Sequence, residues 1–581
     1  MSHKSCVLSV PAVGALLACA AVLISCEGNP FASQDSDYGK RVALERLRSV
    51  PPADLDQYKK PAPKPEQTAE DLAQARHRFD GRESVDLSLE ECRASALEHN
   101  LDLKVAVVNP SLAAQQVTLE DAKFESAFTL RTAYSSVDEP TSSQLVSAEA
   151  KQLTITPGVR IPLRTGGTVN VTLPFDRSEN NNSFSTLNPA YSSDFVVSLS
   201  QELLRGAGRR ANTASIRIAS YNEQATEAET NLEVIRQVAA VDRAYWRLFQ
   251  TRRELEVSQQ QWELAKQQLD HAQHQVNAGS VAPIEVTRAE AGVADRLQAI
   301  IVAQNNVLVQ QRELKRIVNI PGLTVDTKTM IATTTPPDPV QYVFDPQKLA
   351  EQAVSNRMEM LALELRLAAD AANIAFARNQ TLPLLTLDYT YRVNGLGAST
   401  QDSFHMLNRK HYEDWEVGLT ASVPLGNEAA RSQLRMAILT RLQRLSTKQA
   451  QELSIRQEVL NAIDAIDAGW QRVLAARQSV ILNDRALKAE QRQFDVGGST
   501  STNVLDAATR LALAQLTEAQ ALADYQIAQV DLAFATGTLL GASKVSWQPA
   551  PNPPLDTPNP SEQVPASPEP AGASPAPAPQ N

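Results

Sequence analysis

The glycine spacing that most directly suggests chemistry lies in residues 198–211, SLSQELLRGAGRRA. Gly206-x-Gly208-x-x-Ala211 joins a strand-like segment to a helix, which is how a dinucleotide-binding fingerprint begins. Such a site needs a fully buried strand before it and an acidic residue ending a second strand about twenty residues on. Here serines alternate with apolar residues before the glycines, and the residues that follow continue as a helix. We therefore interpret the glycines as permissive backbone where a strand becomes a helix.

Residue types that carry catalysis or bind metal ions are sparse. His271 and His274 form a close histidine pair, but their neighbourhood lacks further metal ligands. The sequence has no nucleophile with a positioned base, no phosphate-cradling lysine motif and no HExxH. The net charge of -11 is spread along the chain, which argues against a nucleic-acid interface. We therefore expect that the protein is not an enzyme, carries no cofactor and binds no nucleic acid.

The start of the chain has the pattern of a targeting segment. A short polar start is followed by an apolar run and by Leu-Ile-Ser-Cys, which ends at Cys26. Residues 1–26 resemble a bacterial lipoprotein signal, which makes Cys26 the lipidated first residue of the mature chain. Cys19, in Leu-Leu-Ala-Cys, is a second candidate, although apolar residues follow it. An uncleaved membrane anchor is a further alternative.

Two other flanking segments have compositions unlike a packed domain. Residues 27–85 are polar with scattered prolines, which predicts a linker and an N-terminal segment. Residues 549–581 are rich in proline and alanine, and such a tail cannot bury enough apolar surface to become ordered.

If Cys26 is the processed residue, Cys92 is the only cysteine of the mature chain, so neither a disulfide nor a cysteine metal site forms within one chain.

The remaining sequence contains an internal repeat. NLDLKVA aligns with RMEMLAL, and VNAGSVAPIEV aligns with FDVGGSTSTNV further along the chain. We therefore expect two copies of one structural unit, at about 87–320 and 346–541.

Each copy contains two segments in which apolar and polar side chains alternate. They lie at about 126–137 and 194–204 in the first copy and at about 384–393 and 414–425 in the second. This alternation predicts strands with one apolar and one wet face. A membrane-spanning strand needs ~9–11 residues, so these segments are long enough to cross a bilayer.

Each copy also contains a long helix with an apolar residue at every seventh position. The two helices are expected at 209–277 and 428–496, and each would be roughly 100 Å long. A strict seven-residue repeat predicts left-handed supercoiling against neighbouring helices. An ordinary bundle core is the alternative. The repeated residues are Val234, Val241, Leu248, Leu255, Trp262, Leu269 and Val276, then Val459, Ile466, Val473, Val480, Leu487 and Phe494. Helices of about half that length are expected at 88–123, 282–318, 346–380 and 502–540.

The order and spacing of these elements resemble the TolC-like outer-membrane efflux proteins. The resemblance covers about residues 87–541. It rests on LSLEECRASALEHNLDL, LSQELLRGAGRRANTASIRIA, VNAGSVAPIEVTRAEA, NRMEMLALELRLAADAANIAFARNQTLPLLTLDYTY, SVPLGNEAARSQLRMA and FDVGGSTSTNVLDAATRLALAQ.

The resemblance implies a membrane β-barrel plus an α-helical barrel. Each chain of a homotrimer would give four strands to a twelve-stranded outer-membrane barrel, continued by a twelve-helix periplasmic tunnel. The sequence supports assembly independently, because four strands cannot close a barrel and an open sheet edge is not tolerated in lipid. The implied partners are a periplasmic adaptor protein and an inner-membrane pump.

The resemblance also assigns roles to two tip turns and to the helix that follows the second. Gly279 and Ser280 form one turn, and Gly497, Gly498 and Ser499 form the other. These turns would lie at the periplasmic entrance and contact the adaptor.

Members of the family often carry two aspartates, three residues apart, that constrict the entrance and favour cations. Here Asp506 matches the second position and Asn503 occupies the first. We expect a single acidic ring at most. The alternative for Asp506 is a solvated carboxylate that the helix dipole stabilises.

The first copy carries an insertion with a second pair of alternating segments. Residues 152–176 alternate on both sides of Gly166-Gly167, which suits a tight hairpin turn. We predict an extra hairpin in the extracellular loop, covering or extending the barrel mouth. Two additional barrel strands per chain are the alternative.

The strand-to-helix junctions of the two copies use different residues for one bend. Gly206 and Gly208 occupy the first junction, and Pro424 and Gly426 occupy the second. The resemblance implies that the first junction lies at the membrane's inner edge, where we expect three arginines to contact lipid phosphates. These are Arg205, Arg209 and Arg210.

Two functions fit these patterns. One is a passive export duct in the outer membrane, lipid-anchored at Cys26 and extending into the periplasm. The other is a periplasmic coiled-coil lipoprotein that spaces the envelope and forms no pore. Alternating strands that end in aromatic residues favour the duct, since a scaffold has no use for them.

Overall fold

The computed structural model describes residues 76–142, 146–279, 282–496 and 498–545. The described residues all belong to one unit of the chain, which begins at Ala75. Cys26, Cys19 and the 549–581 tail lie outside the described residues.

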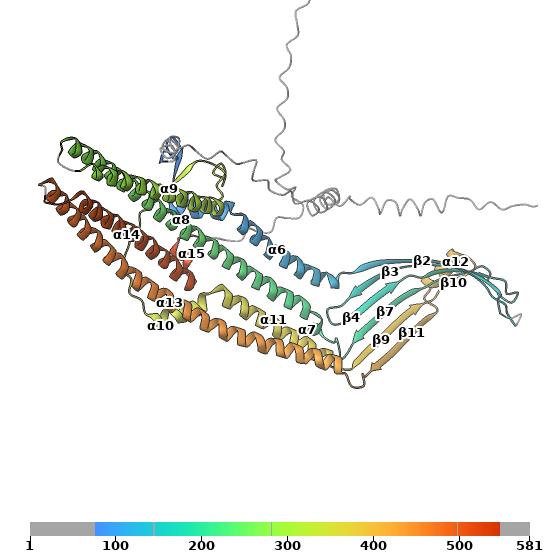
Figure 1. The fold of residues 1–581 in the computed structure, drawn as a ribbon. Helices are drawn as coiled ribbons and strands as arrows, with labels where there is room; N and C mark the ends of the chain where they lie inside the picture. Colours follow the sequence, from blue (N-terminus) through green and yellow to red (C-terminus); the bar gives the residue numbers. More distant parts are fainter. Residues whose placement is uncertain (1–75, 143–145, 280–281, 497, 546–581) are drawn as a thin grey trace, which may run out of the picture. The chain divides into compact units, whose positions relative to one another are not determined.

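Two long helices with shorter helices beside them make up the helical part (Figure 1). The long helices are α8, Ala214–Asn277, and α13, Glu428–Asp495. None of the described helices is long and apolar enough to cross a membrane. The shorter helices of the described residues are α5 Leu89–His99, α6 Leu101–Asp121, η2 Ala122–Phe124, α7 Arg209–Asn212, α9 Ile284–Val318, α10 Pro346–Asn356, α11 Met358–Gln380, α12 Thr400–Asn408, α14 Ser501–Ala535 and α15 Leu539–Ala542.

The half-length helices line the two long ones. α6 and α11 pack along the part of α8 nearer the sheet, and α9 and α14 pack along its farther part (Figure 1). α13 packs against α11 and α14. The seven-residue stripe of α8 forms the contact, since Val234, Val241 and Leu248 are fully buried. Each such side chain contributes about 1.5–3 kcal/mol when it leaves water.

Two of the predicted half-length helices are interrupted. α5 and α6 meet at Asn100, and α10 and α11 meet at Arg357, where both residues have extended backbone. The internal repeat aligns these two positions. Asn100 restarts its helix by accepting the Leu103 N–H at 2.9 Å, while its amide donates to the Ile317 carbonyl at 2.8 Å. The breaks therefore depend on tertiary partners that the sequence pattern does not show.

A small parallel sheet lies against α8. It pairs β1, Ser84–Leu87, with β8, Met330–Thr333. The Tyr245 hydroxyl of α8 donates to the Leu87 carbonyl at 3.2 Å and accepts the Thr335 N–H at 2.9 Å. The end of the predicted linker is thus a strand, paired with a segment far along the chain.

The main sheet is antiparallel and has six strand positions. In order across the sheet these are β2, β3, β4 followed by β5, β6 followed by β7, β9 followed by β10, and β11. Among the described residues β2 pairs only with β3, and β11 only with β9, so these two strands are the edges. The strand bounds are β2 Ala127–Asp138, β3 Glu149–Pro162, β4 Gly167–Thr172, β5 Phe175–Asn180, β6 Ala190–Ser193, β7 Phe195–Glu202, β9 Leu384–Val393, β10 Leu396–Gly397 and β11 Glu413–Ser422.

The inserted hairpin lies inside this sheet and not in a loop beyond it. β3 pairs with β2 along its whole length, and β4 pairs with β7, so the hairpin separates β2 from β7. Residues 152–176 are therefore strands of the described sheet, as in the alternative of two additional strands per chain, and not a hairpin confined to a loop. The physical reason is register: the apolar alternation of residues 152–176 continues that of the neighbouring strands, so the backbone hydrogen bonds of β3 and β4 are satisfied within the sheet.

A short helix that sequence patterns did not predict, α12, follows β10. Phe404 of α12 packs against Phe175, with ring centroids 5.1 Å apart. The Ser403 hydroxyl lies 2.7 Å from that of Ser193 in a buried contact. α12 therefore covers the end of the sheet that is farther from the long helices (Figure 1).

Candidate functional site

The two faces of the main sheet differ in chemistry across its middle, while β5, Phe175–Asn180, is polar on both faces after Phe175. Successive side chains of a strand point to opposite faces, and cross-strand partners share a face. One row of cross-strand partners is apolar: Phe128, Val159, Val171, Val197, Tyr391 and Trp415. The adjacent row on the other face is mostly polar: Ala127, Arg160, Asn170, Ser198, Thr390 and Glu416. The sheet therefore offers one surface suited to lipid and one suited to water.

The first strand-to-helix junction is shaped by its two glycines. Gly206 and Gly208 have φ of 77° and 87°, the left-handed region that favours glycine. The Gly206 N–H donates to Asn379 Oδ1 at 2.8 Å, and the Gly208 N–H donates to the Thr165 carbonyl at 2.9 Å. A Cβ on Gly206 would lie 1.5 Å from a carboxylate oxygen of Glu202. Protein acceptors thus occupy the glycine N–H groups, which leaves no phosphate cradle.

The second junction makes its bend with different residues. Pro424 and Gly426 lie between β11 and α13, and Gly426 has a φ of 92°. Asn427 follows with a φ of 50°, and its amide donates to the Thr381 carbonyl at 2.7 Å, just beyond α11. In each junction an asparagine thus anchors the bend to neighbouring backbone.

The three arginines of the first junction are available to an anion. Arg209 and Arg210 open α7 and are exposed, while Arg205 is half-buried. None of them forms an ion pair with a carboxylate of the described residues. Such a cluster suits the negative charge of a lipid head group.

The first tip turn lies between α8 and α9. Gly279 has a φ of 72°, and its N–H donates to the Val276 carbonyl at 2.9 Å. Ser280 lies outside the described residues. A left-handed glycine after the last helical turn is a common way to end a helix.

The second tip turn lies between α13 and α14. The Gly498 N–H donates to the Gln493 carbonyl at 2.8 Å, and the Ser499 hydroxyl donates to the Glu490 carboxylate. Gly497 lies outside the described residues. Figure 1 shows that both turns lie at the end of the long helices that is farther from the sheet.

Asn503 and Asp506 lie beside the second tip turn at the start of α14. Asn503 donates from its side-chain amide to the Ser499 hydroxyl at 3.2 Å. Both side chains are exposed, and Asp506 forms no ion pair with a described residue. Asp506 lies beyond the first turn of α14, where the attraction of the helix dipole has largely fallen off.

The histidine pair and the free cysteine have structural surroundings. His271 packs against Phe494 with ring centroids 5.2 Å apart, which joins the two long helices near their tips. The described residues contain no group of three or more His, Cys, Asp or Glu side chains that could hold a metal ion. Cys92 is fully buried, and burial raises the pKa of its thiol to about 12.

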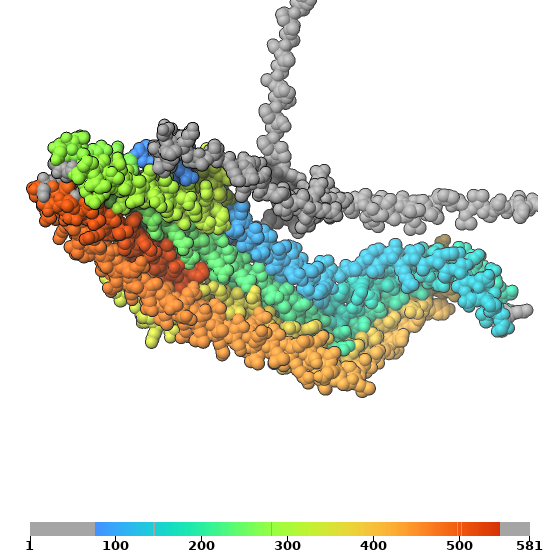
Figure 2. All heavy atoms as spheres, in the orientation of Figure 1, coloured from blue at the N-terminus to red at the C-terminus, as the bar shows by residue number. Residues whose placement is uncertain are grey.

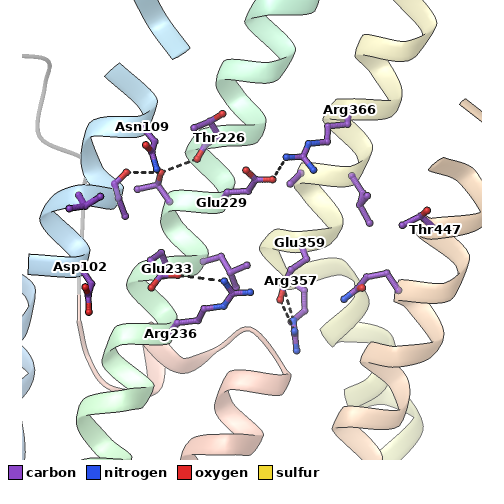
Figure 3. Close-up of a pocket in the computed structure, with 17 residues that line it drawn as sticks. Asp102, Asn109, Thr226, Glu229, Glu233, Arg236, Arg357, Glu359, Arg366 and Thr447 are labelled. Carbon is purple, nitrogen blue, oxygen red and sulfur yellow. Dashed lines mark hydrogen bonds and ion pairs between the residues drawn. The ribbon is translucent and has the colours of Figure 1, made fainter. Parts of the chain in front are cut away.

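A hollow of about 1090 Å³ lies among α6, α8, α11 and α13 (Figure 3). Charged side chains line it, and most of them face an opposite charge. The ion pairs that Figure 3 marks are Arg366 with Glu229, Arg236 with Glu233, and Arg357 with Glu359. Because these charges neutralise one another, we interpret the hollow as a polar seam between the two repeats.

Arg357 holds this seam together at the break between α10 and α11. It is nearly buried and donates to Glu359 at 2.6 and 3.0 Å and to Glu458 of α13 at 2.8 Å. It also donates to the Ala535 carbonyl at the end of α14 at 3.3 Å. Burial opposes ionisation of Glu359, but the hydrogen bonds from Arg357 outweigh it and lower the pKa of Glu359.

Comparison with known proteins decides the family. Residues 168–319 and 349–538 match the model of the outer membrane efflux protein family, and together they span more than half of the chain. The chain belongs to the outer membrane efflux protein family. Members of this family are outer-membrane efflux channels and not enzymes. The resemblance found in the sequence is thus confirmed.

Curated relatives carry the same description. The outer membrane protein TolC of Vibrio cholerae is 27% identical over 352 residues, which cover 59% of this chain and 76% of the relative. TolC of Escherichia coli is 26% identical over 314 residues, covering 51% of this chain and 60% of the relative. The chain thus spans about three fifths of the Escherichia coli protein.

Solved structures share the fold. The outer membrane protein VceC of Vibrio cholerae superposes with a TM-score of 0.56 at 16% identity, covering 77% of this chain and 96% of VceC. The CmeC outer membrane channel of Campylobacter jejuni gives a TM-score of 0.58 at 14% identity, covering 83% of this chain and 90% of CmeC. The efflux protein therefore has the fold of an outer-membrane channel.

Proposed function

We propose that three copies of the chain form a passive duct through the outer membrane. It exports small molecules or proteins from the periplasm or from a pump, as part of a tripartite efflux or type I secretion system. The polar sheet face lines the outer part of the duct, and the helices line the periplasmic part. The duct supplies no energy, so direction comes from its partners.

The observation that carries this proposal is a pair of unpartnered margins, each with apolar side chains in a seven-residue register. On α6, Val105, Leu112 and Leu119 are 71%, 63% and 59% exposed. On α13 the exposed apolar residues of one register are Leu439, Leu453, Leu460, Leu474 and Ile481, and the polar residues Ser446 and Asp467 occupy its two other positions. Exposed apolar heptads require partner helices, and two different margins of one chain close a ring when copies join them. The family fold supports a helical tunnel formed in this way.

The tip turns and Asp506 form the periplasmic entrance in this proposal. The turns around Gly279 and Gly498 dock the periplasmic adaptor, which connects the duct to an inner-membrane pump. Three copies of Asp506, with Asn503 beside each, line the opening and favour cations. Asp506→Asn is expected to lower cation selectivity, measured as the reversal potential across a salt gradient.

Lipid contacts complete the proposed placement. Cys26 anchors the mature chain in the outer membrane, and the tip turns extend into the periplasm. Arg205, Arg209 and Arg210 contact phosphate groups at the inner edge of the membrane. Mass spectrometry of the mature N-terminus tests the anchor, since an unmodified Cys26 or acylation at Cys19 would reject it.

A pore-free lipoprotein that spaces the envelope is the second candidate. Its support is the length of the two long helices, of 64 and 68 residues. A scaffold without a pore does not require a sheet with one apolar and one polar face, so the presence of such a sheet favours the duct.

Single-channel recording separates the two candidates. Purified full-length trimer in a planar bilayer is expected to give discrete, ohmic current steps. A trimer that inserts but conducts no current at any applied voltage would reject the duct in favour of the scaffold.

A pair of variants links the current to assembly. Leu453→Glu places a charge in the exposed stripe of α13 and is expected to abolish both the trimer and the current, because the charge would be buried against a neighbouring chain. Ser454→Glu, at the next exposed position, is the matched control and should leave both unchanged.

A further inference from the structure

Each chain brings six strand positions to the sheet, and the two additional ones come from the inserted hairpin. β3 has 14 residues and pairs with β2 on one side and with β4 and β5 on the other. β6 and β7 follow next, then β9 and β10, and finally β11. The sheet of this chain thus exceeds the four strands that the family resemblance implies.

The inserted hairpin crosses the full height of the sheet. Its turn lies beside the helices: Arg164 forms an ion pair with Asp121 at the end of α6 at 2.8 Å. The Thr165 carbonyl accepts the N–H of Gly208 at the first strand-to-helix junction. The opposite end of the hairpin lies with the far ends of β2 and β6. Both strands therefore run from the junction to the outer end, as a membrane strand must.

The inserted strands also continue both faces of the sheet. The apolar row from Phe128 to Trp415 includes Val159 of β3 and Val171 of β4. The polar row on the opposite face includes Arg160 and Asn170 at the same strands. A hairpin outside the bilayer would have no need to match a lipid-facing row, so this match places the strands in the membrane layer.

The two edges of the sheet are open and complementary. Phe128 on β2 and Trp415 on β11 are each 71% exposed. Open edges are not tolerated in lipid, and six strands are fewer than the roughly eight of the smallest barrels. Because six antiparallel strands alternate in direction, β11 of one chain runs antiparallel to β2 of the next. A second copy of this chain is therefore the partner that fits each edge.

The helices present the same two margins. α6 leads into β2, and β11 leads into α13, so each margin continues from helix to strand (Figures 1 and 2). Copies that join α13 to α6 thus bring β11 to β2 at the same time.

We propose that the trimer closes an eighteen-stranded barrel in which β11 of each chain pairs with β2 of the next. The proposal rests on the trimeric duct described above. Barrel diameter grows roughly linearly with strand number, so this barrel is about one and a half times as wide as a twelve-stranded one. In porins, barrels with this number of strands enclose an aqueous channel. Cargo selection then falls to the helical tunnel and its entrance, and the outer mouth admits bulky cargo.

Surface labelling of intact cells tests where the hairpin turn lies. Thr165→Cys places a thiol at the turn, and Ser183→Cys places one in the connection between β5 and β6 at the other end of the sheet. A maleimide carrying a polymer too large to cross the outer membrane should label Ser183→Cys and spare Thr165→Cys until the cells are broken. Labelling of Thr165→Cys in intact cells would overturn the proposal. The native Cys92 is not expected to react with the maleimide, because its side chain is buried.

Cross-linking tests the strand order in the membrane. Asn170 and Ser198 lie opposite each other across β4 and β7, with Nδ2 and Oγ 3.4 Å apart. Asn170→Cys with Ser198→Cys should be joined by dibromobimane within one chain. Ser198→Cys with Thr390→Cys, across β7 and β9, is the control that links whether or not the hairpin is inserted.

The outcomes separate this inference from the proposed function. A link in the control pair alone, in a trimer that still conducts, overturns the eighteen-stranded barrel and leaves the duct standing. Links in both pairs, with three chains per particle by native mass spectrometry, support eighteen strands. Links in both pairs without any trimer would reject the shared barrel and the duct together.

Discussion

At the residue scale, Arg357 and Asn100 occupy equivalent positions in the two repeats and stabilise the same backbone break by different chemistry. Asn100 uses a neutral amide that caps α6 and reaches the Ile317 carbonyl. Arg357 uses a guanidinium that joins three helices through Glu359, Glu458 and a carbonyl. The break is thus retained in both copies while its chemistry differs.

Arg357→Ala is expected to destabilise the protein by about 3 kcal/mol, because it leaves the largely buried Glu359 without its partner. The matched control is Arg366→Ala. Arg366 and its partner Glu229 are both more than 40% exposed, so this loss should cost under about 1 kcal/mol. Thermal unfolding of both variants in detergent gives the comparison, and equal melting temperatures would contradict the assigned role of Arg357.

At the element scale, the strands and long helices were predictable because their periods are local. Alternation over about ten residues marked β2, β7, β9 and β11, and the seven-residue stripe marked α8 and α13. What could not be predicted depends on distant partners. β1 exists because it pairs with β8, and the place of the hairpin in the sheet depends on the pairing of β4 with β7. The charged seam around Arg357 had no sequence signal except the alignment of the repeats.

In the candidate site, too, the sequence indicated the local features and missed those that depend on distant partners. The glycine spacing at Gly206 correctly indicated a strand-to-helix junction, since the left-handed backbone there requires glycine. The asparagines Asn379 and Asn427, which anchor the two junctions, were missed because their acceptors and donors lie on separate elements.

Gly206→Ala tests the junction. The new methyl group would meet Glu202, and a φ of 77° costs a non-glycine residue about 1–2 kcal/mol, so the heat stability of the trimer should fall. Gly292→Ala is the matched control, because Gly292 lies inside α9 with open space around it. Alanine at this helical position should raise the free energy of unfolding by about 0.5–1 kcal/mol. Gel analysis of the trimer after graded heating measures both, and an unchanged Gly206→Ala trimer would count against the junction's role.

At the scale of the whole molecule, the arginines of the first junction link the duct to the membrane. Replacing Arg205, Arg209 and Arg210 together by Gln is expected to reduce insertion into liposomes with anionic lipids, since each phosphate contact is worth about 1 kcal/mol. The control removes three exposed helix arginines far from the junction: Arg253, Arg288 and Arg316. Equal insertion of the two triple variants in a flotation assay would reject the lipid contact.

The central claim at this scale is that copies of one chain, open at both margins, close around a single lumen. A cryo-electron microscopy reconstruction of the full-length protein in lipid nanodiscs tests it most directly. We predict threefold symmetry, β11 of each chain beside β2 of the next, eighteen strands, and an unbroken lumen from the tip turns to the outer end of the sheet. Particles in which β2 and β11 remain unpaired, or helices packed without a lumen, would contradict it.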